Sequence, residues 1–212
     1  MATFLTLADY LTQLRRLLHD SGDVFWSAAA KTAYLNMAMQ QRDRDTGMNR
    51  TQALVTLTAG TSAYLLTAGN ANTYDVINIT LFNGSVPYQL EMRGFSDNTI
   101  RYRGFTNFTQ QPVCVTKYGA SSLIFLPPPD QNYVTEWDCV LISPALVNTT
   151  DQDPLPYPWT DPVPYMAAHF ANLEIQKQEE ADRFLKLYES RLLGVQAGAR
   201  GMMVSNPYFN TD

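Results

Sequence analysis

Apolar residues recur at helical spacing near the start of the chain. Leucines lie three or four residues apart after Thr6 and so share one face of a predicted helix: Leu7, Leu11, Leu14 and Leu18. Thr6 is a favoured N-cap residue, and Asp9, three positions later, makes a variant of the capping box. The sequence Ser-Gly-Asp that follows Asp20 breaks the pattern and predicts that the helix ends near Asp20.

A second helix is predicted after Ser27, which is another favoured N-cap residue. Gly47 supplies its C-terminal stop. One face carries small and apolar side chains that would allow close contact with another helix: Ala30, Ala33, Tyr34, Met37 and Ala38.

From Thr51 the pattern alternates, which predicts strands. Ala53, Val55 and Leu57 fall on one side of the first strand, and residues 74–82 predict a second one. Asn83-Gly84 is a hairpin signal because both positions accept positive φ. A further turn is predicted at Gly119-Ala120, and a short helix over residues 96–103. The region yields about seven short strands, as expected for a small sandwich or barrel.

The last part of the chain returns to helical spacing after two stiff connectors, Pro127–Pro129 and Pro154–Pro158. Thr160 is the predicted N-cap of a helix whose buried face comprises Met166, Phe170 and Leu173. The pattern slips near Gln178, where a final helix begins. Its apolar stripe consists of Phe184, Tyr188, Leu192 and Val195.

These patterns predict an α+β protein. The N- and C-terminal helices would form a four-helix-type α domain, with a central antiparallel β sandwich or barrel inserted between them. The expected boundaries are residues 1–50 and 151–200 for the two halves of the α domain, 51–150 for the β-rich insert and 201–212 for an extended C-terminal arm.

The chain has 212 residues and a formal net charge of -5. An acidic chain is a poor candidate for wrapping nucleic acid, but it suits a passage through which DNA slides without sticking.

Cys114 and Cys139 lie in apolar, strand-like runs, so we expect thiols rather than a disulfide. The first residues, MATFLTLADY, lack a basic n-region and a small-residue cleavage site, and no apolar run approaches the ~20 residues that span a bilayer. We therefore expect neither a secretory signal nor a membrane segment.

Few residues suggest catalysis. The sequence has no metal-ligand spacing, phosphate-binding loop, dinucleotide-binding glycine pattern or nucleophile elbow, so we expect no metal, no cofactor and no enzymatic activity. His19 and His169 are interpreted as structural. Paired carboxylates can cleave a glycosidic bond. The candidates, for which solvated strand and turn charges are the favoured interpretation, are Glu91, Asp97, Glu136 and Asp138.

Five arginines gather in the N-terminal part of the sequence: Arg15, Arg16, Arg42, Arg44 and Arg50. They are candidates for contacts with DNA phosphates in a channel. Asp43 and Asp45 alternate with them, however, so a salt-bridged helix face or a subunit interface is favoured.

Apolar residues also follow the last predicted helix, without any periodicity: Met202, Met203, Val204, Pro207, Tyr208 and Phe209. Terminal segments usually fray. Aromatic anchors on an arm are also a means of docking into a groove on a neighbouring protein. We interpret this segment as a docking arm.

The layout resembles the head-to-tail adaptor (connector) proteins of tailed bacteriophages, particularly those of short-tailed phages. The opening segment TLADYLTQLRRLLHDSGDVFWSAAAKTAYLNMAMQQ is similar to that family's leading helix, Asp-containing loop, aromatic-Ser cap and second helix with a Leu-Asn pair. The closing segment PYPWTDPVPYMAAHFANLEIQKQEEADRFLKLYESRLL is similar to its two last helices. The segments FSDNTIRYRGF and IFLPPPD resemble the middle of such proteins.

The resemblance implies a dodecameric ring seated under the portal, extending the DNA channel and carrying the tail nozzle and fibres. The implied partners are other copies of the chain, the portal protein, nozzle and fibre or spike proteins, and passing DNA without sequence specificity, but no membrane. The C-terminal arm would act in portal docking. The implied location is the neck or tail of the virion, after assembly in the host cytoplasm.

Two alternative functions stay open. A virion-associated peptidoglycan-cleaving enzyme would use the carboxylates named above. A carbohydrate- or receptor-binding module of the tail would use aromatic stacking surfaces, although such residues more often form core and cross-strand pairs. The aromatic candidates are Tyr64, Tyr74, Tyr88, Tyr102 and Trp137.

Overall fold

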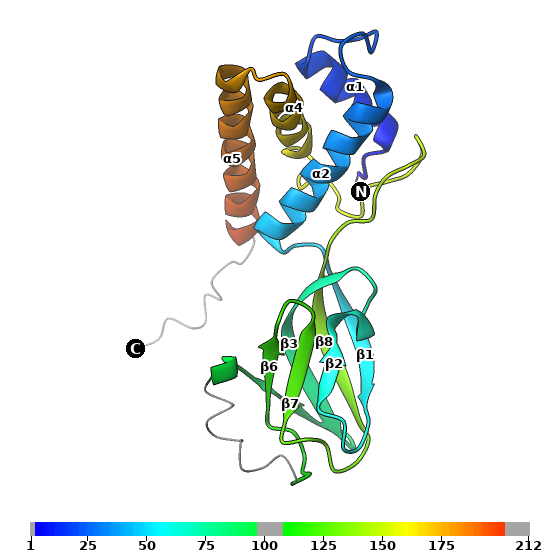
Figure 1. The fold of residues 1–212 in the computed structure, drawn as a ribbon, viewed down its shortest axis with the longest axis vertical. Helices are drawn as coiled ribbons and strands as arrows, with labels where there is room; N and C mark the ends of the chain where they lie inside the picture. The colour runs from blue at the N-terminus through cyan, green and yellow to red at the C-terminus, as the bar shows by residue number, and fades with distance from the viewer. Residues whose placement is uncertain (1–2, 97–107, 202–212) are drawn as a thin grey trace. The chain divides into compact units, whose positions relative to one another are not determined.

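The chain folds into two compact units, one of helices and one of strands (Figure 1). The structure is a computed structural model and describes residues 3–96 and 108–201. The helical unit comprises Met1–Thr46 and Ser143–Asp212, and the β unit comprises Gly47–Ile142. The predicted α+β class is confirmed.

The described part of the helical unit has four helices: α1 (Leu7–Leu17), α2 (Ala28–Thr46), α4 (Val163–Glu174) and α5 (Gln178–Gly201). Helix α4 packs against each of the other three, and the small residues Ala167, Ala168 and Ala171 are fully buried there. All four helices contribute to one hydrophobic core. The helices before and after the β unit therefore depend on one another for burial of their apolar faces.

The predicted caps of α1 and α2 are confirmed. The Oγ1 atom of Thr6 accepts the Asp9 N–H at 3.3 Å, and the Asp9 carboxylate accepts the Thr6 N–H at 2.9 Å. The Ser27 hydroxyl accepts the Ala30 N–H at 3.2 Å. The predicted cap of α4 is wrong, because Pro162 occupies the N-cap position and makes no side-chain hydrogen bond.

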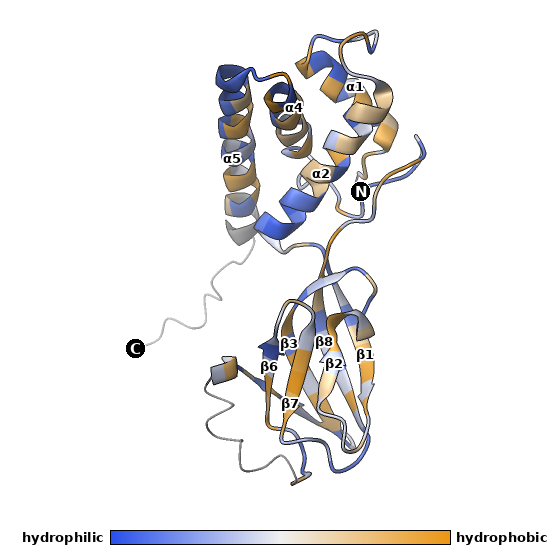
Figure 2. Cartoon of the chain, in the orientation of Figure 1, coloured by the Kyte–Doolittle hydropathy of each residue, from blue (hydrophilic) through white to orange (hydrophobic). Residues whose placement is uncertain are grey.

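Two predicted helix faces need correction. In α2, Ala33 and Met37 are exposed. The buried face combines apolar residues with three ionisable ones, Lys31, Arg42 and Asp43; its apolar members are Leu35, Ala38 and Met39. The end of α2 is strongly hydrophilic, although part of it is buried (Figure 2). In α4, Met166 is buried, whereas Leu173 is 37% exposed. The stripe predicted for α5 is confirmed, with Tyr188, Leu192 and Val195 buried and Phe184 packed against them.

In the described part of the β unit, the strands form two four-stranded sheets with separate strand orders, β1-β8-β3-β4 and β2-β7-β6-β5. Residues of both sheets form one core cluster. The described strands are β1 (Arg50–Leu57), β2 (Ala63–Leu65), β3 (Thr73–Asn83), β4 (Val86–Gln89), β5 (Glu91–Arg93), β6 (Cys114–Tyr118), β7 (Ser122–Leu126) and β8 (Tyr133–Leu141), with a short 3-10 helix, η1 (Leu66–Ala68).

Most local predictions for the β unit are confirmed. Val55 and Leu57 are buried on the inner side of β1, and hairpin turns at Gly84 and Gly119 place these glycines at φ values of 60° and 65°. The helix predicted over residues 96–103 lies outside the described residues, apart from Ser96.

Two features of the β unit depart from the predictions. Strands β5 and β6 are parallel, so the insert is not wholly antiparallel. A register shift lies between Val76 and Asn78 of β3. It leaves Val76, Ile79 and Leu81 all buried, whereas Ile77 is 43% exposed. A bulge adds one residue to a strand and so breaks the strict alternation of buried and exposed positions that the sequence pattern of residues 74–82 predicts.

Cys114 and Cys139 are buried, and neither is in a disulfide, as predicted. Within the described ranges, every helix is too short or too polar to cross a membrane.

Candidate functional site

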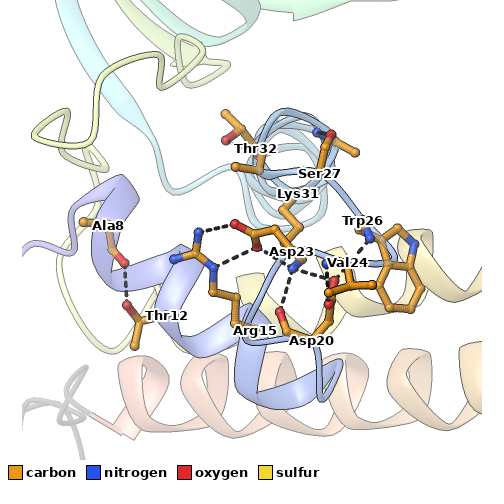
Figure 3. Close-up of polar contacts among 12 residues, drawn as sticks. Ala8, Thr12, Arg15, Asp20, Asp23, Val24, Trp26, Ser27, Lys31 and Thr32 are labelled. Atoms are coloured by element: carbon orange, nitrogen blue, oxygen red, sulfur yellow. Dashed lines mark hydrogen bonds and ion pairs between the residues drawn. The ribbon is translucent and has the colours of Figure 1, made fainter.

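The loop between α1 and α2 is fixed from within by a buried lysine (Figure 3). The Lys31 Nζ atom donates to the carbonyl oxygen of Asp20 at 2.9 Å, and to the carboxylates of Asp20 and Asp23 at 2.8 and 2.7 Å. The Lys31 side chain has 0% exposure. Lysine is almost never fully buried without a partner. Here the three acceptors match the three donors of the ammonium group.

The two carboxylates also hold the backbone of this loop and the end of α1. The Asp20 carboxylate accepts the N–H groups of Val24 and Trp26 at 2.8 and 3.1 Å. Asp23 receives two parallel hydrogen bonds from Arg15, at 2.9 and 2.6 Å. The loop is thus ordered by charge-assisted bonds, which are the stronger class of protein hydrogen bonds.

These contacts also hold both carboxyl groups in the ionised form. The Lys31 hydrogen bond lowers the pKa of Asp20 to about 2, with the loop N–H groups acting in the same direction. Hydrogen bonds from Arg15, and then from Lys31, hold the pKa of Asp23 well below its usual range. Both carboxyl groups are therefore ionised at neutral pH.

The ordered loop presents two large apolar side chains to solvent. Val24 is 80% exposed and Phe25 is 83% exposed, whereas the neighbouring Trp26 is 8% exposed. We call Val24 and Phe25 the apolar knob. Because the backbone N–H of Val24 is already held by Asp20, docking of the knob would cost little ordering entropy. Such pre-ordered aromatic anchors are typical centres of protein interfaces.

A second charge network lies between α2 and the connector that precedes α4. The Arg42 guanidinium donates to Asp153 at 2.6 and 3.1 Å, and to Asp43 at 3.1 and 2.9 Å. Asp153 also accepts the Tyr10 hydroxyl at 2.6 Å, and Asp43 accepts the Ser143 N–H at 2.7 Å. The three ionised residues are almost fully buried.

Burial and neighbouring charges shift the pKa values of two members of this network, Tyr10 and Arg42. Loss of hydration, followed by the charge of Asp153, raises the pKa of the Tyr10 hydroxyl far above its ordinary value. Burial opposes the charge of Arg42, but the hydrogen bonds and charge of Asp153 and the charge of Asp43 outweigh it and raise the pKa of Arg42. Tyr10 therefore remains a neutral donor beside a charged pair.

The five arginines proposed from the sequence do not form one surface cluster. Arg15 binds Asp23 in the loop network, and Arg42 is removed from the set of surface cations because its side chain is fully buried. Arg16 and Arg44 are exposed on the helical unit. Arg50 belongs to β1 of the other unit, where it lies 3.6 Å from Asp138.

A groove of about 570 Å³ lies beside the same loop of the helical unit. Its lining combines basic and apolar side chains with one carboxylate and other polar groups: Arg16, Leu17, Leu18, His19, Trp26, Asn172, Lys177, Glu180, Arg183, Phe184 and Leu187. His19 is therefore one of the residues that line the groove. His169 is buried, and its Nδ1 atom lies 2.8 Å from the Ala181 carbonyl oxygen, which agrees with a structural role.

The candidate residues for sugar chemistry are also dispersed. Glu91 lies in β5, where it pairs with Arg93, whereas Glu136 and Asp138 lie in β8 of the other sheet. Trp137 is fully buried beside Phe125, and Tyr64 meets the Phe125 ring edge-on at 5.5 Å, so neither ring is an open stacking surface. Tyr74 and Tyr88 are about half exposed.

Some predicted sites lie outside the described residues: Asp97, Tyr102, and the arm residues Met202, Met203, Val204, Pro207, Tyr208 and Phe209. In the part of the chain that the structure describes, no group of three or more acidic, histidine or cysteine side chains is placed to hold a metal ion.

Neither the apolar knob nor the buried Lys31 was predicted from the sequence. Lys31 was unremarkable in a helix of mixed polarity. A signal did exist, since Val24-Phe25-Trp26 is an apolar run directly after a polar turn. It does not reveal which of the three side chains is buried.

The described residues thus combine an α+β fold with an apolar knob that is exposed on an ordered loop. Residues 5–207 match the family described as SU10 adaptor protein. The chain therefore belongs to the SU10 adaptor protein family and is a phage adaptor protein, a structural class of virion component. No curated protein matches the sequence.

Proposed function

We propose that this phage adaptor forms a dodecameric ring between the portal and the tail nozzle and fibres, and that the ring extends the DNA channel. The observation that carries the proposal is the apolar knob. Val24 and Phe25 are 80% and 83% exposed on a loop that buried ion pairs hold in place. A monomer gains nothing from such a display, whereas a repeated subunit contact would bury it.

We infer that the knob of one copy docks against the helical unit of the next copy. Burial of a phenylalanine side chain contributes up to about 3 kcal/mol, and in a ring each copy makes this contact once. A heterologous contact of this kind closes into a ring when the rotation between copies allows it.

Two further parts of the proposal concern the portal and the DNA. The apolar residues between Met202 and Phe209 would dock on the portal as an arm. DNA would pass without sequence-specific contacts, in keeping with the net charge of -5. Arg16 and Arg44 are the exposed cations of α1 and α2 that remain available for weak phosphate contacts.

The test compares full-length Phe25→Ser with full-length Tyr74→Ser, a matched control at an exposed aromatic residue of the β unit. Each protein is mixed with portal rings and observed by negative-stain imaging and sedimentation. We expect that Phe25→Ser stays folded by circular dichroism but forms at least tenfold fewer rings, while Tyr74→Ser assembles normally. Normal assembly of Phe25→Ser would contradict the proposal that the apolar knob makes the contact between copies. Deletion of residues 202–212 should abolish portal attachment.

A further inference from the structure

Strand β1 is the open edge of its sheet. It pairs only with β8 in the described part of the β unit. The Leu141 N–H donates to the Asn49 carbonyl oxygen at 2.7 Å, and Asn49 is followed by a continuous register from Arg50–Val140 to Leu57–Tyr133. In an antiparallel ladder only every second residue bonds to the neighbouring strand. The odd-numbered residues of β1 therefore bond to β8.

It follows that the four even-numbered residues of β1 direct their backbone N–H and C=O groups toward the open edge: Arg50, Gln52, Leu54 and Thr56. Their side chains are all exposed, and Leu54 is 72% exposed. Backbone groups at a sheet edge form a template for another strand.

The other edges of these two sheets are protected, whereas β1 is not. Edge strands commonly carry lysine, proline or a bulge, or are very short. Strands β2 and β5 have three residues each. Strand β4 contains Pro87. The Leu90 N–H donates to the Ile79 carbonyl oxygen, so in the same ladder the backbone of Pro87 faces outward and offers no donor.

By contrast, β1 runs for eight residues, RTQALVTL, without proline, glycine, lysine or a register shift. Its residues from Thr51 to Leu57 are uncharged. Like charges directly opposite one another destabilise strand pairs. Because its centre is uncharged, two copies of β1 can pair there without repulsion between like charges.

We propose that β1 pairs antiparallel with β1 of a second copy, about a two-fold axis at Leu54. Only a register that places even residues opposite even residues matches the outward backbone groups. With the axis at Leu54, this residue faces Leu54 of the second copy, and Gln52 faces Thr56 of the second copy. The exposed leucines cover one another, and the two sheets join into one continuous sheet.

This contact is separate from the ring contact proposed above and does not depend on it. A two-fold contact closes after two copies, so it cannot be the contact that repeats around a ring. We assign it to the free protein before assembly, where it would cover an edge that is otherwise prone to aggregation.

Cysteine substitutions read out both the contact and its register. Residues opposite one another in a hydrogen-bonded pair have Cα atoms about 5.5 Å apart, within the range that a disulfide bridges. Three full-length variants, Leu54→Cys, Gln52→Cys and Thr56→Cys, are oxidised alone and in mixtures, and dimers are counted on non-reducing gels. Cys114 and Cys139 are 1% and 0% exposed and do not compete.

We expect that Leu54→Cys forms a covalent dimer at least tenfold faster than Tyr74→Cys, an exposed control on β3. Gln52→Cys and Thr56→Cys should link to each other in a mixture much faster than either links to itself. If Leu54→Cys reacts no faster than Tyr74→Cys, or if mixing makes no difference, the self-pairing is wrong.

A second pair of variants tests the outward backbone N–H of residue 52. Gln52→Pro lacks an outward N–H but keeps every bond to β8, whereas Gln52→Ala keeps that donor. Sedimentation should show a monomer for Gln52→Pro and a dimer for both Gln52→Ala and the natural sequence. A dimer that survives Gln52→Pro overturns the proposal. Because Phe25→Ser is read on portal rings, failure of the ring proposal would leave these results unchanged.

Discussion

The Arg42 guanidinium and the Asp153 carboxylate form two hydrogen bonds, at 2.6 and 3.1 Å, although the two residues lie 111 positions apart in the sequence. The β unit lies between these residues in the chain, so the pair joins the two halves of the helical unit. Asp153 also accepts the Tyr10 hydroxyl and the Leu155 N–H. One carboxylate thus fixes α1, α2 and the connector that precedes α4.

Replacing Arg42 with Met is expected to lower the free energy of unfolding of the helical unit by about 3–5 kcal/mol. The substitution keeps most of the side-chain volume but leaves Asp43 and Asp153 buried without their cation, which is the costly way to break a buried pair. Urea unfolding followed by helical circular dichroism measures the change.

Arg44→Met is the matched control, since Arg44 is two residues away and exposed. An exposed substitution of this kind should change stability by no more than about 0.5 kcal/mol. Equal stability of Arg42→Met and Arg44→Met would show that the buried network contributes nothing.

Acid should loosen the loop between α1 and α2. The pKa of Asp20 falls from an ordinary value of 3.8 to about 2 in the folded chain, because of its hydrogen bond with Lys31. A group whose pKa is depressed on folding stabilises the protein above its unfolded pKa and loses that contribution as the pH falls through the folded value. Stability should therefore decline between about pH 4 and pH 2.

The measurement is thermal unfolding of the helical signal from pH 7 to pH 2. Asp20→Asn should be less stable at pH 7 and should show a flatter decline with acid, whereas Glu189→Gln, at an exposed residue of α5, should follow the natural protein. A parallel decline in Asp20→Asn and the natural protein would assign acid sensitivity to other carboxylates.

Gly69→Ala should destabilise the β unit by about 1–3 kcal/mol through overpacking. A Cβ atom at Gly69 would lie 2.7 Å from the Cys139 Sγ atom and 3.3 Å from the Trp137 ring. Gly194→Ala in α5 meets nothing within 4 Å and should instead stabilise its helix by up to about 1 kcal/mol. Opposite signs in denaturant unfolding confirm the packing argument, and a neutral Gly69→Ala contradicts it.

Local features of the fold could be predicted because their causes lie within a few residues. The Thr6–Asp9 capping box, the Ser27 cap, the turn at Gly84 and the stripe around Tyr188 each depend on short spacings. Such features follow from helix periodicity and turn geometry alone.

The features that could not be predicted depend on contacts between residues that are distant in the sequence. Alternating charges made Arg42 look like a surface residue, and only its approach to Asp153 makes burial favourable. Nothing near Lys31 indicates that Asp20 and Asp23 will surround it. The bulge that exposes Ile77 depends on the partner strand β8, and the parallel pairing of β5 depends on β6.

The sequence by itself therefore determined the helices, the strands, most of their caps and turns, and the resemblance to phage adaptors, because hydrophobic spacing and local hydrogen bonds act within single elements. Only the tertiary structure decided which charges are buried, which apolar side chains stay exposed at Val24 and Phe25, and which sheet edge stays open at β1. Desolvation and strand pairing depend on neighbours that are distant in sequence, and their energies are set when those neighbours meet.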